Sequence, residues 1–316
     1  MCNFLVSLLD YPVKAEAQAY RTRIFVRKPV KPADFSGRMY LDIYNASNGY
    51  GIEDVWRRSY QYYIENGHIY IGITSKPVNV QSLEKIDYNR YKSLYWVNIQ
   101  AEDVPEIINP IKAIPGTEEG LIWDMLSQLG YLIKTNQAPF LANYAVEELY
   151  MTGQSQSGIY LNTYVYFFHS YVQEIFDGFL TVLGAGRMRD LRQKERRVSL
   201  AGIRDQLIAN TEIPFILLSS HGDINLFRSK THILQDLADC YPKIRHYELA
   251  SSPHTDPTLP MKPAGSEVAK TVDSSRLLGG SYDYKVNFIQ LAYYVNAARN
   301  FYINGLSMAR NRQLPA

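Results

Sequence analysis

The residues best suited to chemistry are Gly153-Gln154-Ser155-Gln156-Ser157-Gly158. This run stands between a segment that alternates like a strand and one with helical spacing, so it predicts a sharp strand-to-helix turn. A turn of this kind with a serine at its tip is called a nucleophile elbow. The residues two before and two after the serine must be small, because they pack against each other. Gly153 and Ser157 meet that condition for Ser155, whereas Ser157 has Ile159 at the same offset. The alternative is a glycine–serine turn that has no chemistry.

A nucleophilic serine needs two partners later in the chain, a carboxylate and then a histidine, each after a strand. Asp223 follows the apolar strand-like segment Ile213–Ser219, and His254 follows Ile244–Ala250. In this arrangement the imidazole takes the proton from the serine hydroxyl, and the carboxylate fixes the tautomer of the imidazole. We therefore predict Ser155 as the nucleophile, His254 as the general base and Asp223 as the acid.

Other histidines and carboxylates offer alternatives to this assignment. His221 stands beside Asp223 but precedes it, which is the wrong chain order for the base. If Asp223 is not the acid, Glu248 and Asp256 are the next carboxylates to consider. The two His-x-Asp pairs that begin at His221 and His254 also suit a metal ion, but a metal site leaves the serine turn unexplained, and the sequence has no HExxH motif or cysteine cluster. We therefore predict no metal and no cofactor.

Stabilising the negative charge of a tetrahedral intermediate needs well-placed hydrogen-bond donors, which form an oxyanion hole. The backbone N–H of Gln156, directly after the serine, is the first candidate. A second donor is expected from the loop after the third strand, Asn45-Ala46-Ser47-Asn48-Gly49, in which Asn45 and Ala46 stand nearest the strand end. The same loop also suits a helix N-cap with Asx turns, and the two interpretations are compatible.

Strand-like and helix-like segments alternate along the chain. Period-two alternation or continuous apolar runs predict strands, and apolar residues three and four apart predict helices. The predicted strands are Ala19–Val26, Arg38–Tyr44, His68–Thr74, Glu147–Met151, Gly178–Leu183, Ile213–Ser219 and Ile244–Ala250, and the predicted helices are Ile52–Ile64, Thr117–Lys134, Ile159–Ile175 and a last one from Tyr284 to Tyr302. This order is typical of an α/β fold, with a mostly parallel central sheet and helices on both faces. Sites in such sheets lie at the carboxyl ends of the strands.

Composition excludes several classes of protein. The 316 residues include 33 basic and 31 acidic ones, and the formal charge of +2 argues against nucleic acid or an anionic membrane surface as a partner. Two cysteines are too few for a disulfide framework or a four-ligand zinc site. The apolar opening Met1–Leu9 has no basic flank and is too short for a signal peptide or a membrane span. We expect a cytoplasmic protein with no membrane partner.

The elbow, the acid and the histidine, in this order, resemble the α/β-hydrolase superfamily. Further motifs resemble, more closely, the poorly characterised "alpha/beta hydrolase domain" family of serine hydrolases. These motifs are Tyr20-Arg21-Thr22-Arg23-Ile24-Phe25-Val26-Arg27-Lys28-Pro29, Asp34-Phe35-Ser36-Gly37, Asp42-Ile43-Tyr44-Asn45, Asp87-Tyr88-Asn89-Arg90-Tyr91, Gly153–Gly158 and Ser252-Pro253-His254-Thr255-Asp256. The likeness extends over most of the chain, from Ala19 to Tyr302.

The resemblance implies a single α/β-hydrolase domain over residues 1–316, and we expect cap insertions at 187–212 and 256–282. Members of the family carry more sequence before the first strand than Met1–Gln18 provides, so the first strands are expected to be incomplete. The resemblance also implies the nucleophile role for Ser155 and the base role for His254.

From the residues and the resemblance together we expect a serine hydrolase that cleaves a carboxylic ester through an acyl-enzyme, with a small-molecule ester as substrate. An amidase or an acyltransferase would use the same three residues. A non-catalytic small-molecule binding protein on this fold is the alternative from a different class.

Overall fold

The computed structural model describes residues 19–96, 118–172, 175–184, 187–189, 213–227, 244–254 and 289–300. The first 18 residues, nearly all of the expected insertion at 187–212 and the whole insertion at 256–282 lie outside these ranges. The expectations for those segments therefore stay predictions, as does the place of Asp256.

A seven-stranded sheet forms the centre of the described fold, in the order β2-β4-β3-β6-β7-β8-β9. Neighbours from β4 to β9 pair in parallel, and β2 pairs antiparallel with β4 at the edge. The strands β4, β7 and β8 are buried along their whole length, as expected for strands covered on both faces. The strands are β2 (Ile24–Arg27), β3 (Arg38–Ile43), β4 (Ile69–Ile73), β6 (Glu148–Gln154), β7 (Gly178–Val182), β8 (Phe215–Ser220) and β9 (Ile244–Leu249). The predicted mostly parallel α/β sheet is confirmed.

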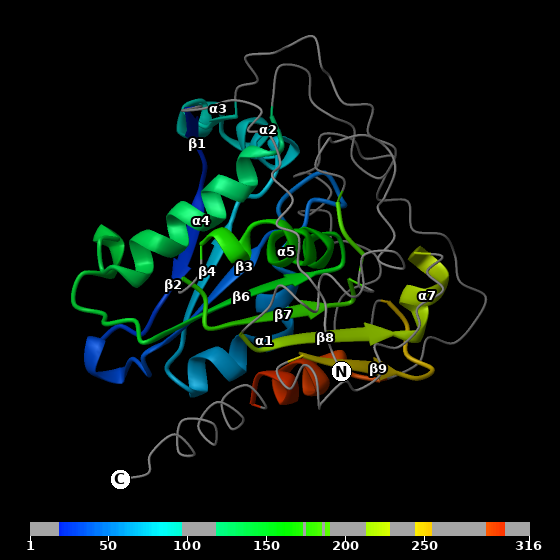
Figure 1. Cartoon of the computed structure of the whole chain (residues 1–316). Helices are drawn as coiled ribbons and strands as arrows, with labels where there is room; N and C mark the ends of the chain where they lie inside the picture. The colour runs from blue at the N-terminus through cyan, green and yellow to red at the C-terminus, as the bar shows by residue number, and fades with distance from the viewer. Residues whose placement is uncertain are drawn as a thin grey trace.

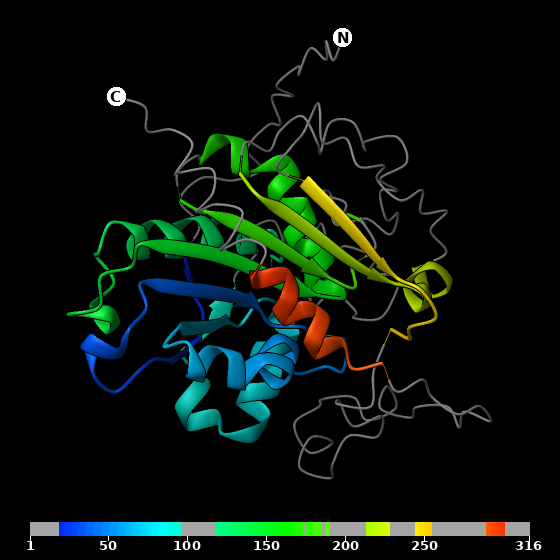
Figure 2. The same cartoon turned by 90° about the horizontal axis from the view of Figure 1, so that it is seen from below.

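Helices cover both faces of this sheet (Figures 1 and 2). Helices α4 (Leu121–Lys134) and α5 (Gln156–Phe167) lie on one face, and α1 (Asp54–Glu65) and the helical residues 291–300 lie on the other. The shorter elements are α2 (Pro77–Ile86), α3 (Tyr88–Tyr91), α7 (His221–Phe227) and the 3-10 turns η1 (Pro32–Asp34), η2 (Pro139–Leu141) and η3 (His169–Tyr171). Of the helices in the described ranges, none has the length and apolar character needed to cross a membrane.

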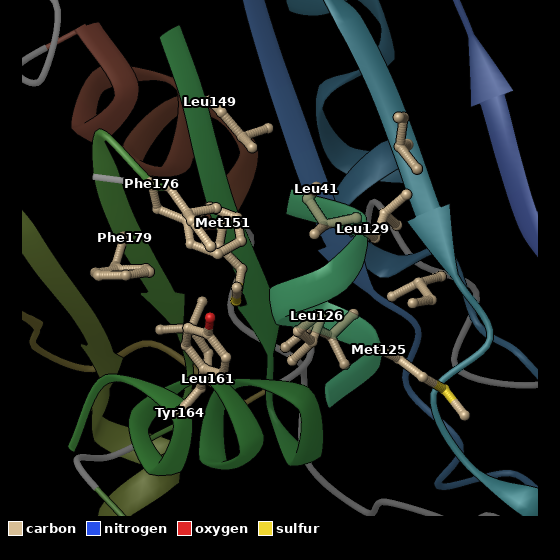
Figure 3. Close-up of a cluster of buried hydrophobic side chains, with 14 of the residues drawn as sticks. Leu41, Met125, Leu126, Leu129, Leu149, Met151, Leu161, Tyr164, Phe176 and Phe179 are labelled. Atoms are coloured by element: carbon tan, nitrogen blue, oxygen red, sulfur yellow. The ribbon is translucent and has the colours of Figure 1, made fainter. Parts of the chain in front are cut away.

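The larger hydrophobic core lies between the sheet and the helices α4 and α5 (Figure 3). Leu41 and Met151 come from β3 and β6, Leu126 from α4 and Leu161 from α5, and all four side chains are fully buried. Each such side chain contributes about 1.5–3 kcal/mol through the apolar surface that it removes from water. This core fixes α5, and therefore the turn that precedes it, against the sheet.

On the opposite face, tyrosines and one buried arginine pack together with aliphatic side chains. The guanidinium of Arg299, from the helical residues 291–300, lies 4.9 Å from the ring centroid of Tyr63 on α1. Arg299 is 1% exposed and donates hydrogen bonds to Ser59 Oγ at 2.5 Å and Asn296 Oδ1 at 2.8 Å. A cation over an aromatic ring is stabilised most where water is excluded. Arg299 therefore joins the last described helix to α1.

The strand predicted over Ala19–Val26 is in fact two strands that belong to different sheets. Tyr20–Arg21 forms β1, which pairs antiparallel with β5 (Tyr95–Trp96) outside the main sheet. The chain then enters the main sheet as β2. Between the two, Thr22 Oγ1 donates a hydrogen bond to Thr74 O at 2.8 Å, which fixes the point where the chain changes sheets.

The helix predicted over Ile159–Ile175 begins earlier, at Gln156, and ends earlier, at Phe167. Ile175 and Phe176, beyond this end, pack onto α4 at Gly130. A β-carbon at Gly130 would lie 2.5 Å from Ile175 Cγ2, which shows how closely these two segments approach. The bend at 168–171 accommodates this contact.

The close packing of Tyr44 over Gly72 in β4 provides a test of the fold. A β-carbon at Gly72 would lie 2.0 Å from Tyr44 Cε1, and the Tyr44 ring is 2% exposed. We expect Gly72→Ala to lower the free energy of unfolding by about 3 kcal/mol, the upper part of the usual range for overpacking. Urea denaturation of the two proteins measures the difference.

A double-mutant cycle with Tyr44→Leu identifies the cause of that loss. Because leucine removes the ring, Gly72→Ala in the Tyr44→Leu background should cost less than about 1 kcal/mol. An equal cost in both backgrounds would contradict the proposed contact.

Candidate active site

Ser155 lies in the turn between the end of β6 and the start of α5, as the sequence pattern predicts. Its backbone angles are φ 56° and ψ −117°, in a region that residues with a β-carbon rarely adopt. The Ser155 N–H donates to Val182 O of the neighbouring strand at 2.8 Å, and Ser155 O accepts from the Ile159 N–H in α5 at 3.0 Å. Sheet and helix thus hold the two sides of the strained residue.

The turn closes because its flanking residues are small. A β-carbon at Gly153 would lie 2.5 Å from Ser157 O, and one at Gly158 would lie 3.0 Å from Thr181 Cγ2. Ser157 itself is fully buried, and its Oγ has no hydrogen-bond partner within the described part of the chain. Its position makes Ser157 a packing residue of the turn.

Three side chains form a continuous line of hydrogen bonds at this turn. Ser155 Oγ lies 2.8 Å from His254 Nε2, and His254 Nδ1 lies 2.5 Å from Asp223 Oδ1. Asp223 is fully buried and its second oxygen, Oδ2, accepts from the Ser220 N–H at 2.8 Å. The carboxylate is therefore held on both oxygens, and the imidazole lies between it and the serine hydroxyl.

The parallel pairing of β8 and β9 brings Asp223 and His254 together. The two strands are in register from Phe215 with Ile244 to Ser220 with Leu249, so their carboxyl ends finish side by side. Gly222 lets the following segments approach: its N–H donates to Ser252 O at 2.9 Å, and a β-carbon there would lie 2.5 Å from the His254 backbone nitrogen. The glycine between His221 and Asp223 is the signal in the sequence for this contact.

The loop after β3 lies against the turn and is closed by its own hydrogen bonds. Asn45 and Ile52 form an isolated bridge, in which the Asn45 N–H donates to Ile52 O and the Ile52 N–H donates to Asn45 O. The Asn45 side chain donates from Nδ2 to Gln154 O at 3.3 Å. The Ala46 N–H donates to Gln156 Oε1 at 3.1 Å. Of the two candidate donors in this loop, Asn45 has its N–H committed to the bridge, whereas Ala46 directs its N–H toward the residue after the serine.

Two charged residues, Arg58 and Asp54, support this loop and turn, and no motif in the sequence pointed to them. Arg58 Nε donates to Gln154 Oε1 at 2.8 Å, within the buried part of the site. Burial raises the pKa of Asp54 above its ordinary value, while Arg58, Arg57, His254 and a hydrogen bond from Asn45 oppose the shift. The signal that was available is the place of Asp54, at the start of a predicted helix directly after the Asn45 loop.

A buried lysine supports the loop from its other side. Lys76 is fully buried and its Nζ donates to Ser75 Oγ at 2.9 Å, and Ser75 Oγ in turn donates to Tyr44 O at 2.5 Å. Burial lowers the pKa of Lys76 to about 7, with Glu119 opposing the shift and Arg189 adding to it. The carbonyl held in this way belongs to the residue before Asn45.

The other described histidines make contacts elsewhere. His221 is exposed at the start of α7, and His68 and His246 contact Ser36 Oγ and Ser219 Oγ at 2.6 and 2.9 Å. His169 packs edge-on against Phe179. Within the described ranges, no group of three histidine, cysteine, aspartate or glutamate side chains is arranged to hold a metal ion.

Comparison with known proteins identifies the family to which the chain belongs. A family model described as Alpha/beta hydrolase domain matches residues 9–301. No curated protein matches the chain.

The fold is similar to several solved structures at low identity. Dienelactone hydrolase from Anabaena variabilis ATCC 29413 is 11% identical over 74% of this chain and 82% of its own, with a TM-score of 0.41. Esterase B from Lactobacillus rhamnosis is 10% identical over 92% and 82%, with a TM-score of 0.45. Thermogutta terrifontis esterase 2 is 8% identical over 90% and 89%, with a TM-score of 0.43. Similarities at this low identity and TM-score do not indicate what the protein does. The match of the family model over residues 9–301 shows that the chain belongs to the alpha/beta hydrolase domain family.

Proposed function

We propose that the protein is a serine hydrolase that cleaves a carboxylic ester through an acyl-enzyme. The observation that carries the proposal is the line of hydrogen bonds from Ser155 Oγ through His254 to Asp223, at a strained strand-to-helix turn. A serine hydroxyl is a weak nucleophile unless a base removes its proton, and the imidazole 2.8 Å away is placed to do so.

The reaction proceeds in two halves. Ser155 Oγ attacks the ester carbonyl carbon while its proton passes to His254 Nε2, and the same proton then leaves on the alkoxide as the ester bond breaks. Water attacks the resulting acyl-enzyme with His254 again as the base, which releases the acid and restores the serine. Asp223 holds the imidazole in the tautomer that presents Nε2 to the serine and stabilises the imidazolium.

The Gln156 and Ala46 backbone N–H groups are the proposed oxyanion donors. The Ala46 N–H already holds a carbonyl oxygen, the Gln156 side-chain Oε1, at 3.1 Å. A substrate carbonyl that becomes negatively charged is a stronger acceptor than this neutral amide, because charge-assisted hydrogen bonds are about twice as strong as neutral ones. The substrate oxygen therefore displaces the Gln156 side-chain oxygen from the Ala46 N–H. Asn45 then acts as a positioning residue through its bridge to Ile52.

Covalent labelling tests the nucleophile. We expect a fluorophosphonate probe to add its mass to the peptide that contains residues 153–158, because only an activated serine attacks phosphorus. His254→Ala should abolish labelling without loss of fold. Ser157→Ala is the matched control and should label like the wild type, since the Ser157 side chain is buried behind the turn. Label on Ser157, or none on the folded protein, would contradict the assignment.

Substitution of the buried carboxylate tests the acid. Asp223→Asn should reduce kcat roughly 10⁴-fold, because the amide favours the wrong imidazole tautomer. Glu248→Gln, on the neighbouring strand β9 and outside the line of hydrogen bonds, is the control and should keep wild-type turnover. Near-normal turnover of Asp223→Asn, with its fold verified by circular dichroism, would show that the acid lies elsewhere.

The reaction class is tested with p-nitrophenyl acetate, butyrate, hexanoate and octanoate and with the matching p-nitroanilides. We expect hydrolysis of at least one ester and its loss in Ser155→Ala. Faster cleavage of the anilides would make the protein an amidase. Absence of turnover for every substrate, with folded protein, would favour the binding protein on the same fold.

A further inference from the structure

A cavity lies beside the loop that carries Ala46, lined by Tyr44 before the loop and by Tyr50, Gly51 and Ile52 at its end. It has a volume of about 420 Å³, within the range of small-molecule sites, roughly 300–1,000 Å³. Its walls come from β2, the end of β4, the start of α1, the helices α2 and α3, and both flanks of the Asn45–Ile52 loop. Neither Ser155 nor His254 is among its lining residues.

The carboxylate of Glu53, in the wall of this cavity, is already paired with an arginine of the same wall. Glu53 accepts from Arg27 Nη1 at 3.0 Å and from Nη2 at 2.7 Å, and the Tyr44 hydroxyl donates to the same carboxylate. The Arg27 guanidinium also lies 4.3 Å from the centroid of the Phe25 ring. These contacts satisfy both partners of the ion pair, which leaves the rest of the lining to determine the charge of the cavity.

Two further arginines give the cavity a surplus of positive charge. Arg23 and Arg57 line it, and within the described ranges neither guanidinium makes a hydrogen bond or an ion pair. Glu53 interacts electrostatically with Arg23, and Asp54 interacts electrostatically with Arg57. With Glu53 committed to Arg27, two of the three lining arginines are available to an anion.

A buried amide adds a donor and an acceptor. Asn79 of α2 lines the cavity and is 1% exposed, yet its Nδ2 and Oδ1 have no hydrogen-bond partner in the described part of the chain. A buried polar group left without a partner destabilises the fold, so a ligand that hydrogen-bonds to it removes that cost. The apolar side chains Leu83 and Ile86 lie on the same helix and complete the wall.

We propose that this cavity binds a small organic anion, a carboxylate or phosphate ester that carries an apolar group. Arg23 and Arg57 bind the charged end, because guanidinium groups match the geometry of both head groups. The apolar group lies against Leu83 and Ile86 of α2. This site is separate from the chemistry proposed for Ser155 and does not rest on it.

The probes are 2-naphthoate, 2-naphthyl phosphate and the neutral 2-naphthalenemethanol, titrated by calorimetry into the full chain. Both anions should bind at least about tenfold more tightly than the alcohol, and the tighter of the two identifies the preferred head group. Equal binding of the alcohol would overturn the proposal. All titrations are repeated on Ser155→Ala and His254→Ala, whose affinities should match the wild type.

Arginine variants locate the site. Arg23→Gln and Arg57→Gln should each weaken anion binding about tenfold or more, and Arg23→Lys should recover part of the loss because it keeps the charge. Arg21→Gln, an exposed arginine on β1 outside the cavity, is the matched control and should bind like the wild type. Binding that depends on His254 but not on Arg23 would place the anion at the catalytic serine and overturn the proposal, whatever the outcome of the labelling experiment.

Discussion

The site depends on one backbone conformation, that of Ser155. A positive φ is unfavourable for a residue with a β-carbon and is maintained only where the surrounding structure determines it on both sides. Here β6 is paired with β7 up to the residue before the serine, and α5 is hydrogen-bonded from the residue after it. The cooperative bonding of a buried sheet and a buried helix offsets the local strain. This conformation places the serine Oγ at the carboxyl edge of the sheet, where Asp223 and His254 follow the ends of β8 and β9.

The parallel sheet and the serine turn could be predicted from the sequence because both have local causes. Runs such as Ile213–Ser219 are apolar because both faces are buried, and Gly153 and Ser157 are small because the turn leaves no room. The end of α5 could not be predicted, since aromatic and aliphatic residues continue past Phe167 at helical spacing, and a contact with Gly130 of a different helix bends the chain. Helix α2 (Pro77–Ile86) went unpredicted because its apolar and polar residues are mixed.

The residues that support the site were harder to predict from the sequence than the candidate catalytic residues. Asp54 and Lys76 are ordinary charged residues in the sequence, and only segments far apart in the chain create the buried surroundings that shift the pKa of each. The choice between Asn45 and Ala46 also needed tertiary information, because it depends on where the Asn45 N–H bonds, namely Ile52 O. The types of residue and their order in the chain thus predict the candidate catalytic residues. The residues that orient them can be identified only from the tertiary packing.

The hydrogen bond between Arg299 and Ser59 joins residues 240 positions apart and has a consequence for synthesis. A domain emerges from the ribosome with its N-terminus first, and contacts of such long sequence separation form last. Every described strand and α1 are synthesised before residues 291–300, so the surface around Tyr63 of α1 that Arg299 later covers lacks this helix at first. Until residues 291–300 have been made, that surface is available to a chaperone.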